Sequence, residues 1–308
     1  MPRAREDGLE AAPRPLLVIG LTARTGTNYL ARLLAAHKDC TRPNALYEDY
    51  MVFGLRHLNR FIRQAGGHWQ PATASEKQKQ LRLLLGGAIT RFLLEDARDP
   101  RKRPVFKTPT VWGVAHAQQF LPRCDIVVLT RNGPDVVESG MRSFGWRFES
   151  ASRFWGDAAR YLVQTCRDRQ RDGMTPLTVV RYEDLVTQPT ATLRAIFAAV
   201  DLPADRFDFD RPANFPVYGS STERGRSEGV TWESVDKPAG FEPLRRSQHW
   251  SEDAYRRFDW LTKGISRDLG YELPFVFENR RGLRYRYLLR DQKLRLPSFL
   301  QERLRYAP

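Results

Sequence analysis

The sequence predicts an α/β fold with a mostly parallel central sheet, flanked by helices, in a single domain. Short continuous apolar runs, such as Leu16–Leu21, have the composition of strands that are buried on both faces. Each run is followed by a segment whose apolar side chains recur at helical spacing. This strand–helix unit is repeated along the chain, and such alternation is typical of parallel sheets.

The first two units lie within residues 16–120. A strand over Leu16–Leu21 precedes a helix, because apolar side chains recur at helical spacing from Leu30 onward. The second unit pairs a short strand at Val105–Lys107 with a helix over Trp112–Phe120. Both predicted strands have lengths that are usual for strands in the sheet of a compact domain.

The third unit is a strand over Asp125–Thr130 with a helix that opens at Pro134 and Asp135. Proline suits the first helical position, and a carboxylate in the first turn suits the helix dipole. A long helix is expected from Ser152 to about Arg171.

The last predicted strand is Leu177–Arg181, and a helix over Pro189–Val200 follows it. The stretch 201–240 is rich in Pro, Gly and Ser but contains apolar residues to bury, which favours a long functional loop. A helix over Ser251–Leu269 is expected to end at Gly270, a residue suited to a helix C-terminus.

Length and composition predict three segments. Residues 1–14 are charged and Pro-rich and predict a flexible tail, 15–275 form the domain, and 276–308 form a basic C-terminal segment.

The chain of 308 residues is 41% apolar, which is enough for a core. It has no apolar run near the roughly 20 residues of a membrane span, no signal-peptide core, and only three scattered cysteines. We expect a reduced, cytoplasmic protein.

The net charge of +14 requires an anionic partner. A nucleotide, an acidic glycan, nucleic acid and a lipid surface all fit that description. The basic segment 276–308 interleaves nine Lys/Arg with Leu, Tyr and Phe. This pattern is compatible with peripheral contact to an acidic membrane, with a solvated face, and with a dimer or partner helix.

The turn after the first strand has the features of a phosphate-binding loop. A buried strand that runs through small residues directly into a helix points several backbone N–H groups at one spot. Gly26 allows close approach, and Arg24 adds a planar cation. Further side-chain donors are Thr25, Thr27 and Asn28. Because Thr27 stands where a nucleotide triphosphatase has Lys, the loop argues against Mg-dependent hydrolysis of nucleotides.

A second anion site is predicted where the strand Asp125–Thr130 ends. Arg131 lies at the carboxyl end of that strand, the edge at which α/β sheets bind ligands. Ser139 falls in the second turn of the next helix, from which it can face the same crevice. The two side chains are suited to holding a terminal phosphate.

These segments resemble sulfotransferases that use 3′-phosphoadenosine 5′-phosphosulfate (PAPS), in the bacterial or carbohydrate-type branch. Ala23–Thr27 is similar to their 5′-phosphosulfate loop, and Arg131–Ser139 resembles their 3′-phosphate segment. Arg181–Leu185 resembles an R-Y-E-D-L segment, so Tyr182 is implied to lie near the adenine, as is Tyr29. The resemblance implies a P-loop-like fold, PAPS as co-substrate, adenosine 3′,5′-bisphosphate (PAP) as product, and no metal.

The same resemblance suggests catalytic residues. Lys107 is implied as the cation that supports the leaving phosphate. Related cytosolic enzymes follow this lysine with Thr and a catalytic His, but here Pro109 replaces the His. Carbohydrate sulfotransferases use a Glu after the first helix, which points to Glu48 as the general base. Asp49 and His116 stay open as alternatives.

The expected function is transfer of a sulfuryl group to a hydroxyl, or an amine, of a carbohydrate, glycolipid or secondary metabolite. Two alternatives remain: a P-loop-type small-molecule kinase and a non-enzymatic polyanion-binding protein. The sequence has no aromatic RNA-binding signature, so no nucleic acid partner is expected.

Overall fold

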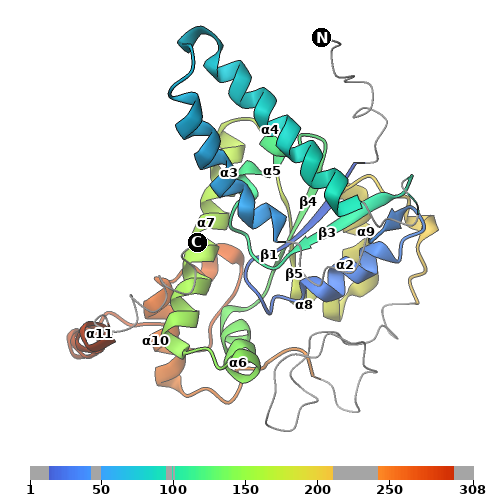
Figure 1. The fold of residues 1–308 in the computed structure, drawn as a ribbon. Helices are drawn as coiled ribbons and strands as arrows, with labels where there is room; N and C mark the ends of the chain where they lie inside the picture. The colour runs from blue at the N-terminus through green and yellow to red at the C-terminus, as the bar shows by residue number, and fades with distance from the viewer. Residues whose placement is uncertain (1–13, 43–49, 95–98, 100, 211–241, 295–308) are drawn as a thin grey trace, which may run out of the picture.

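A parallel sheet lies at the centre of the molecule, with helices on both faces (Figure 1). The computed structural model describes residues 14–42, 50–94, 99, 101–210 and 242–294. The strands are β1 (Leu16–Gly20), β2 (Cys40–Thr41), β3 (Arg103–Thr108), β4 (Asp125–Thr130) and β5 (Thr178–Arg181). Their order is β2-β3-β1-β4-β5, and every pairing is parallel. The predicted fold class is confirmed.

The helices occupy the two faces unequally. One face is covered by α2 (Thr27–Ala35), α8 (Tyr182–Thr187) and α9 (Pro189–Ala199). The larger set on the other side comprises α3 (Met51–Gly66), α4 (Pro71–Leu94), α5 (Val114–Phe120), α6 (Gly133–Phe144), α7 (Phe148–Arg171) and α10 (Glu252–Thr262). Figure 1 shows α3 and α4 side by side, projecting beyond the sheet. Short 3-10 turns, η1 (Ala204–Arg206) and η3 (Arg267–Leu269), and the helix α11 (Arg281–Leu294) complete the described elements.

Burial on both faces explains the continuous apolar run of β1. Leu17 and Ile19 belong to the core cluster beneath α5, α6 and α7. Leu16 and Val18 belong to the second cluster, beneath α2 and α9. Successive side chains of a strand point to opposite faces, so a strand that is covered on both sides must be apolar throughout.

The long helix expected from Ser152 begins earlier, at Phe148. Two other boundaries differ from the sequence-based expectation because of backbone geometry. The helix that was expected from Trp112 begins at Val114, because Gly113 has φ of 97° and lies against α3. A Cβ on Gly113 would come within 2.0 Å of the Val52 carbonyl oxygen. The helix that was expected to reach Leu269 ends at Thr262, where Lys263 and Gly264 both adopt positive φ.

The helices α3 and α4 had no counterpart among the predicted elements. In α4, apolar residues are found on every side of the helix, so it lacks the periodicity on which the prediction relied. None of the described helices is long and apolar enough to cross a membrane.

A buried charge network attaches α11 to the domain. The Arg257 side chain is 1% exposed and donates hydrogen bonds to Glu149 of α7 and Asp291 of α11. Asp291 also accepts a hydrogen bond from the Trp260 indole. Tyr287, 1% exposed, packs beside them. The described part of the predicted C-terminal segment is therefore packed on α7 and α10.

Candidate functional site

The predicted phosphate loop lies between the carboxyl end of β1 and the start of α2. Gly20 at the end of β1 is paired with Leu129 of β4, so the turns after these two strands are neighbours. The helices after them cover opposite faces of the sheet, which makes this edge the topological switch point where α/β folds bind ligands. The first backbone N–H groups of α2 have no acceptor within the helix and are directed at this point.

Gly26 is required by its conformation and by its neighbour. It precedes α2 with φ of 98°, a left-handed value that glycine adopts most readily. A Cβ at this position would approach the Tyr182 ring to 2.5 Å. The backbone of the loop can therefore lie directly on the face of that ring only because residue 26 has no side chain.

The loop is closed by its own threonines. The Thr25 hydroxyl donates to the Thr22 carbonyl oxygen, and the Thr22 amide donates to Thr25 Oγ1 at 3.2 Å. Thr25 is fully buried, and Thr27 is 6% exposed. The side chain of Thr25 thus holds the shape of the turn, while Thr27 opens α2.

Arg24 connects the first predicted segment to the second. Its Nε donates to Ser139 Oγ at 3.1 Å, and Arg131 Nη1 donates to the Arg24 carbonyl oxygen at 3.0 Å. Arg131 and Ser139 are each 6% exposed. The structure therefore brings Arg24 together with two other predicted anion-binding residues, Arg131 and Ser139, which lie more than a hundred positions later in the chain.

Tyr182 forms the wall between the two segments. The Arg131 guanidinium stacks on the Tyr182 ring at 4.7 Å from its centre. Burial raises the pKa of the Tyr182 phenol, so it stays protonated at neutral pH. Burial also raises the pKa of Tyr29 to about 12, with Tyr182 as a second cause, which places the two predicted adenine-side rings near each other.

A segment after residue 242 contributes a third arginine that sequence reasoning missed. Arg131 donates to the Pro243 carbonyl oxygen, and Arg246 is close enough to Arg131 and Arg24 to lower the pKa of Arg24. The only signal in the sequence was a general abundance of arginines between 224 and 246. No spacing rule identified Arg246.

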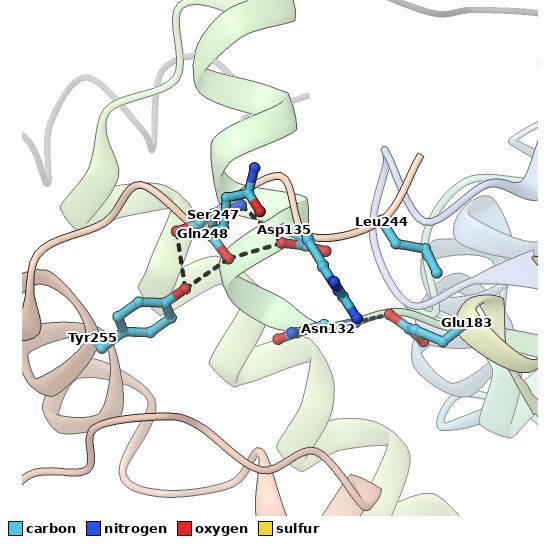
Figure 2. A pocket seen from close by; sticks show the side chains of 8 residues that line it. Asn132, Asp135, Glu183, Leu244, Ser247, Gln248 and Tyr255 are labelled. Atoms are coloured by element: carbon cyan, nitrogen blue, oxygen red, sulfur yellow. Dashed lines mark hydrogen bonds between the residues drawn. The ribbon is translucent and has the colours of Figure 1, made fainter. Parts of the chain in front are cut away.

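Hydrogen bonds to α6 hold this segment in place (Figure 2). Asp135 accepts from the Ser247 amide at 2.9 Å and from its hydroxyl at 2.8 Å. The Tyr255 hydroxyl donates to the Ser247 carbonyl oxygen at 2.9 Å. These residues line a pocket of about 260 Å³ beside the arginines, together with Asn132, Glu183, Leu244, Arg245 and Gln248.

Glu183 stabilises the start of α6. Its carboxylate accepts from the Asn132 amide at 2.9 Å and from the Tyr271 hydroxyl at 3.1 Å. Tyr271 also shares a hydrogen bond of 3.0 Å with Thr130 at the end of β4. The acidic residues near the site therefore position the backbone next to Arg131.

The three arginines repel one another. The pKa of Arg24 is lowered to about 10, first by burial and then by the charges of Arg131 and Arg246. The pKa of Arg246 is also lowered, by burial and then by Arg131. Arg24 and Arg246 nevertheless stay protonated at neutral pH. A bound anion would relieve both the repulsion and the cost of burying the charges.

Lys107 lies in β3, next to β1. It is 2% exposed and is paired in register with Val18. Phe106 belongs to the cluster beneath α5 and α7, so Lys107 points to the opposite face, where α2 begins. Gly20 is close to the same turn, since a Cβ on it would lie 2.9 Å from the Pro109 carbonyl oxygen.

Of the three candidate general bases, the structure describes His116. Glu48 and Asp49 lie outside the described residues. His116 is half-buried in α5, and its Nδ1 lies 3.4 Å from the amide nitrogen of Asn59 in α3. Burial lowers the pKa of His116, as do the nearby charges of Arg82 and Arg63.

No group of three or more side chains suited to a metal ion is found among the residues that the structure describes.

Comparisons with known proteins point to one family. The model of the sulfotransferase family matches residues 15–206, while no curated protein matches the chain. The sulfotransferase domain of the Synechococcus PCC 7002 olefin synthase is 20% identical, with a TM-score of 0.53, and the match covers 85% of this chain and 97% of that domain.

Two further solved structures are similar over most of their length. The sulfotransferase domain from the curacin biosynthetic pathway is 18% identical with a TM-score of 0.45, covering 85% of this chain and 99% of that one. Mouse sulfotransferase SULT7A1, complexed with PAP, is 13% identical with a TM-score of 0.43, covering 91% and 89%.

The contact between Gly26 and Tyr182 leads to a stability prediction. Gly26→Ala should lower the free energy of unfolding by about 2 kcal/mol or more, because left-handed strain of about 1–2 kcal/mol is added to overlap with the ring. Gly173→Ala is the matched control: its φ is 64° with nothing within 4 Å of an added Cβ, so only the strain applies. Urea unfolding measures both. Equal losses in the two variants would show that Tyr182 does not restrict residue 26.

Proposed function

Because the chain belongs to the sulfotransferase family, we propose that it transfers a sulfuryl group from PAPS to a hydroxyl group of an acceptor. The observation that carries this proposal is the convergence of Arg24, Arg131 and Arg246 at the switch point of the sheet. Three mutually repelling cations beside a glycine-containing helix start fit a ligand with phosphate at both ends. The acceptor is a carbohydrate, glycolipid or secondary metabolite.

Each end of the donor has its own set of residues. The 5′-phosphosulfate lies at the amides of Gly26, Thr27 and Asn28. The 3′-phosphate lies at Arg131 and Ser139, with Arg24 and Arg246 beside them. Tyr29 and Tyr182 flank the adenine, and Thr25 keeps the turn closed.

The reaction requires two things of this chain: a base that takes the acceptor proton, and a cation that stabilises the leaving phosphate. The S–O bond to the bridging phosphate oxygen breaks, a new S–O bond forms to the acceptor oxygen, and the acceptor proton passes to a base. Lys107 stabilises the charge on the leaving phosphate oxygen. Glu48 accepts the proton in this proposal, with Asp49 and His116 as the alternatives.

The decisive experiment is incubation of the protein with ³⁵S-labelled PAPS and a panel of acceptors, followed by identification of the labelled product. Transfer that continues in EDTA separates this reaction from that of a Mg²⁺-dependent kinase. Absence of transfer together with absence of PAP binding would overturn the proposal and favour a polyanion-binding protein.

The arginine cluster predicts discrimination between nucleotides. The protein should bind PAP at least about tenfold more tightly than 5′-AMP, since hydrogen bonds to a charged group contribute about 1.5–3 kcal/mol. Arg246→Gln should remove about tenfold of the PAP affinity and leave that for 5′-AMP within twofold. Arg194→Gln is the control, because Arg194 is an exposed arginine of α9 outside the arginine cluster. Equal affinity for the two nucleotides in calorimetry contradicts the 3′-phosphate site.

The assignment of Lys107 predicts a separation of turnover from binding. Lys107→Met keeps most of the side-chain volume and should reduce kcat by about 10²–10³-fold, the usual effect of removing a group that stabilises developing charge. The PAP affinity should change far less. An unaltered kcat in a folded variant removes Lys107 from the mechanism.

Glu48→Gln should reduce kcat similarly, and persistent activity would direct the search to Asp49 and His116.

The outer surface of α11 is suited to an acidic membrane. Tyr285 is 65% exposed and Leu288 and Leu289 are each 42% exposed, while the exposed Arg281 and Arg284 lie beside them. Apolar side chains interleaved with cations match the chemistry of an anionic lipid surface. We propose that α11 makes a peripheral contact of this kind.

Vesicle sedimentation tests the contact. The protein should bind phosphatidylcholine vesicles only when they contain phosphatidylglycerol, and Tyr285→Ser with Leu288→Ser should weaken binding about tenfold or more through lost apolar burial. Phe61→Ser with Leu84→Ser is the control, because those residues of α3 and α4 are 58% and 60% exposed. If no vesicles are bound, α11 is a solvated face; concentration-dependent dimers that the α11 variant abolishes would identify it as an interface between copies.

A further inference from the structure

One face of α3 carries cations without counter-charges. Arg56, Arg60 and Arg63 have the spacing that places side chains on one side of a helix. None of them forms an ion pair with a carboxylate in the described part of the chain. The α3–α4 region, residues 51–94, contains seven Lys/Arg and a single acidic residue, Glu76.

The charges on this face act on one another. The pKa of Arg56 is lowered by burial and then by Arg60. The pKa of His57 is lowered by burial and then by Arg56 and Arg60. Arg63 contributes in the same way to the lowered pKa of His116 in α5. Surface cations usually have acidic neighbours. The row formed by Arg56, Arg60 and Arg63, which we call the stripe, therefore lowers the stability of the folded chain unless an anion binds there.

The basic face of α3 begins beside the segment that follows Lys107. The segment after Lys107 reaches Gly113, whose backbone touches that of Val52 in the first turn of α3. Arg56, one turn further along, lies over the Phe53 ring at 4.2 Å and within the electrostatic reach of Tyr161 in α7. The basic face of α3 therefore leads away from the end of the sheet where Lys107 lies.

Aromatic rings form the adjoining surface. Trp112 packs on Tyr161 with ring centres 4.9 Å apart and on Phe154 at 6.4 Å. The Tyr161 hydroxyl accepts a hydrogen bond of 3.4 Å from the Ala115 amide, which attaches α7 to the start of α5. Flat rings next to arginines suit an acceptor with both ring-shaped and anionic parts.

We propose that the acceptor is an acidic polysaccharide, bound along Arg56, Arg60 and Arg63 with the reacting sugar beside Trp112. This inference rests on the proposed sulfotransferase function, and it specifies the acceptor. Seven residues of helix span about 10 Å, so the three guanidinium groups meet charges on more than one sugar. A polymer that carries a carboxylate or sulfate at regular intervals along the chain supplies such charges as well as the hydroxyl that accepts the sulfuryl group. A small neutral acceptor would leave the stripe unused.

Binding of a labelled hyaluronan oligosaccharide, measured by fluorescence anisotropy, tests this proposal without requiring turnover. The wild-type protein should bind it with an affinity that falls as salt is added, and should not bind neutral dextran of equal length. Replacing Arg56, Arg60 and Arg63 by Gln should weaken binding at least tenfold. The matched control replaces Lys38, Arg194 and Arg267, three exposed cations outside α3 and α11, by Gln, removes the same charge, and should change binding less than twofold.

Several outcomes would overturn the inference. They are equal losses in the two triple variants, equal binding of dextran, and tighter binding of poly-glutamate or an oligonucleotide than of the glycan. Urea unfolding checks that each variant is folded. Calorimetry with PAP keeps the two proposals apart: normal PAP binding without glycan binding defeats only the polysaccharide acceptor, whereas glycan binding without PAP binding defeats the donor site.

Discussion

Arg131 makes the contacts on which the proposed donor site depends. One of its nitrogens donates to the backbone of Arg24 in the first loop, and another donates to the backbone of Pro243. Its flat face lies on Tyr182, the ring that touches Gly26. A single guanidinium thus joins three segments of the chain that are far apart in sequence. Arginine suits this role because its five donors are fixed in one plane and its charge does not depend on pH.

The same contacts concentrate positive charge at a cost. Arg24 and Arg246 are held in the field of Arg131, and the acidic residues nearby are occupied elsewhere: Asp135 by Ser247, and Glu183 by Asn132 and Tyr271. These carboxylates position the backbone and leave the charges of the arginines less compensated. In the proposed donor site a bound anion would offset this cost, and such local costs are common at functional sites.

Local sequence patterns predicted the residues of the first loop and Arg131. The apolar run before Gly26 and the small residues around it marked a strand, a turn and a helix start, and Arg131 followed another apolar run. The sequence did not identify Arg246, because no fixed spacing relates it to either segment. It also did not identify α4, because apolar residues lie on every side of the second half of that helix. The helix α3 was missed although its buried residues Val52, Leu55 and Ile62 recur at helical spacing. The end of α10 was misplaced since the positive φ of Lys263, unlike that of Gly270, has no signal in residue type.

By itself the sequence determined the parallel α/β class and the strand–helix units around β1, β3, β4 and β5, and it predicted two anion-binding turns, because hydrophobic periodicity and turn residues act over only a few positions. Only the tertiary structure decided that Arg24 bonds to Ser139, that Arg246 joins them, and that the cations of α3 begin beside the segment after Lys107. These juxtapositions depend on how helices pack across the sheet and on where the chain returns to it. Packing of that kind is a property of the whole molecule, which no short stretch of sequence encodes.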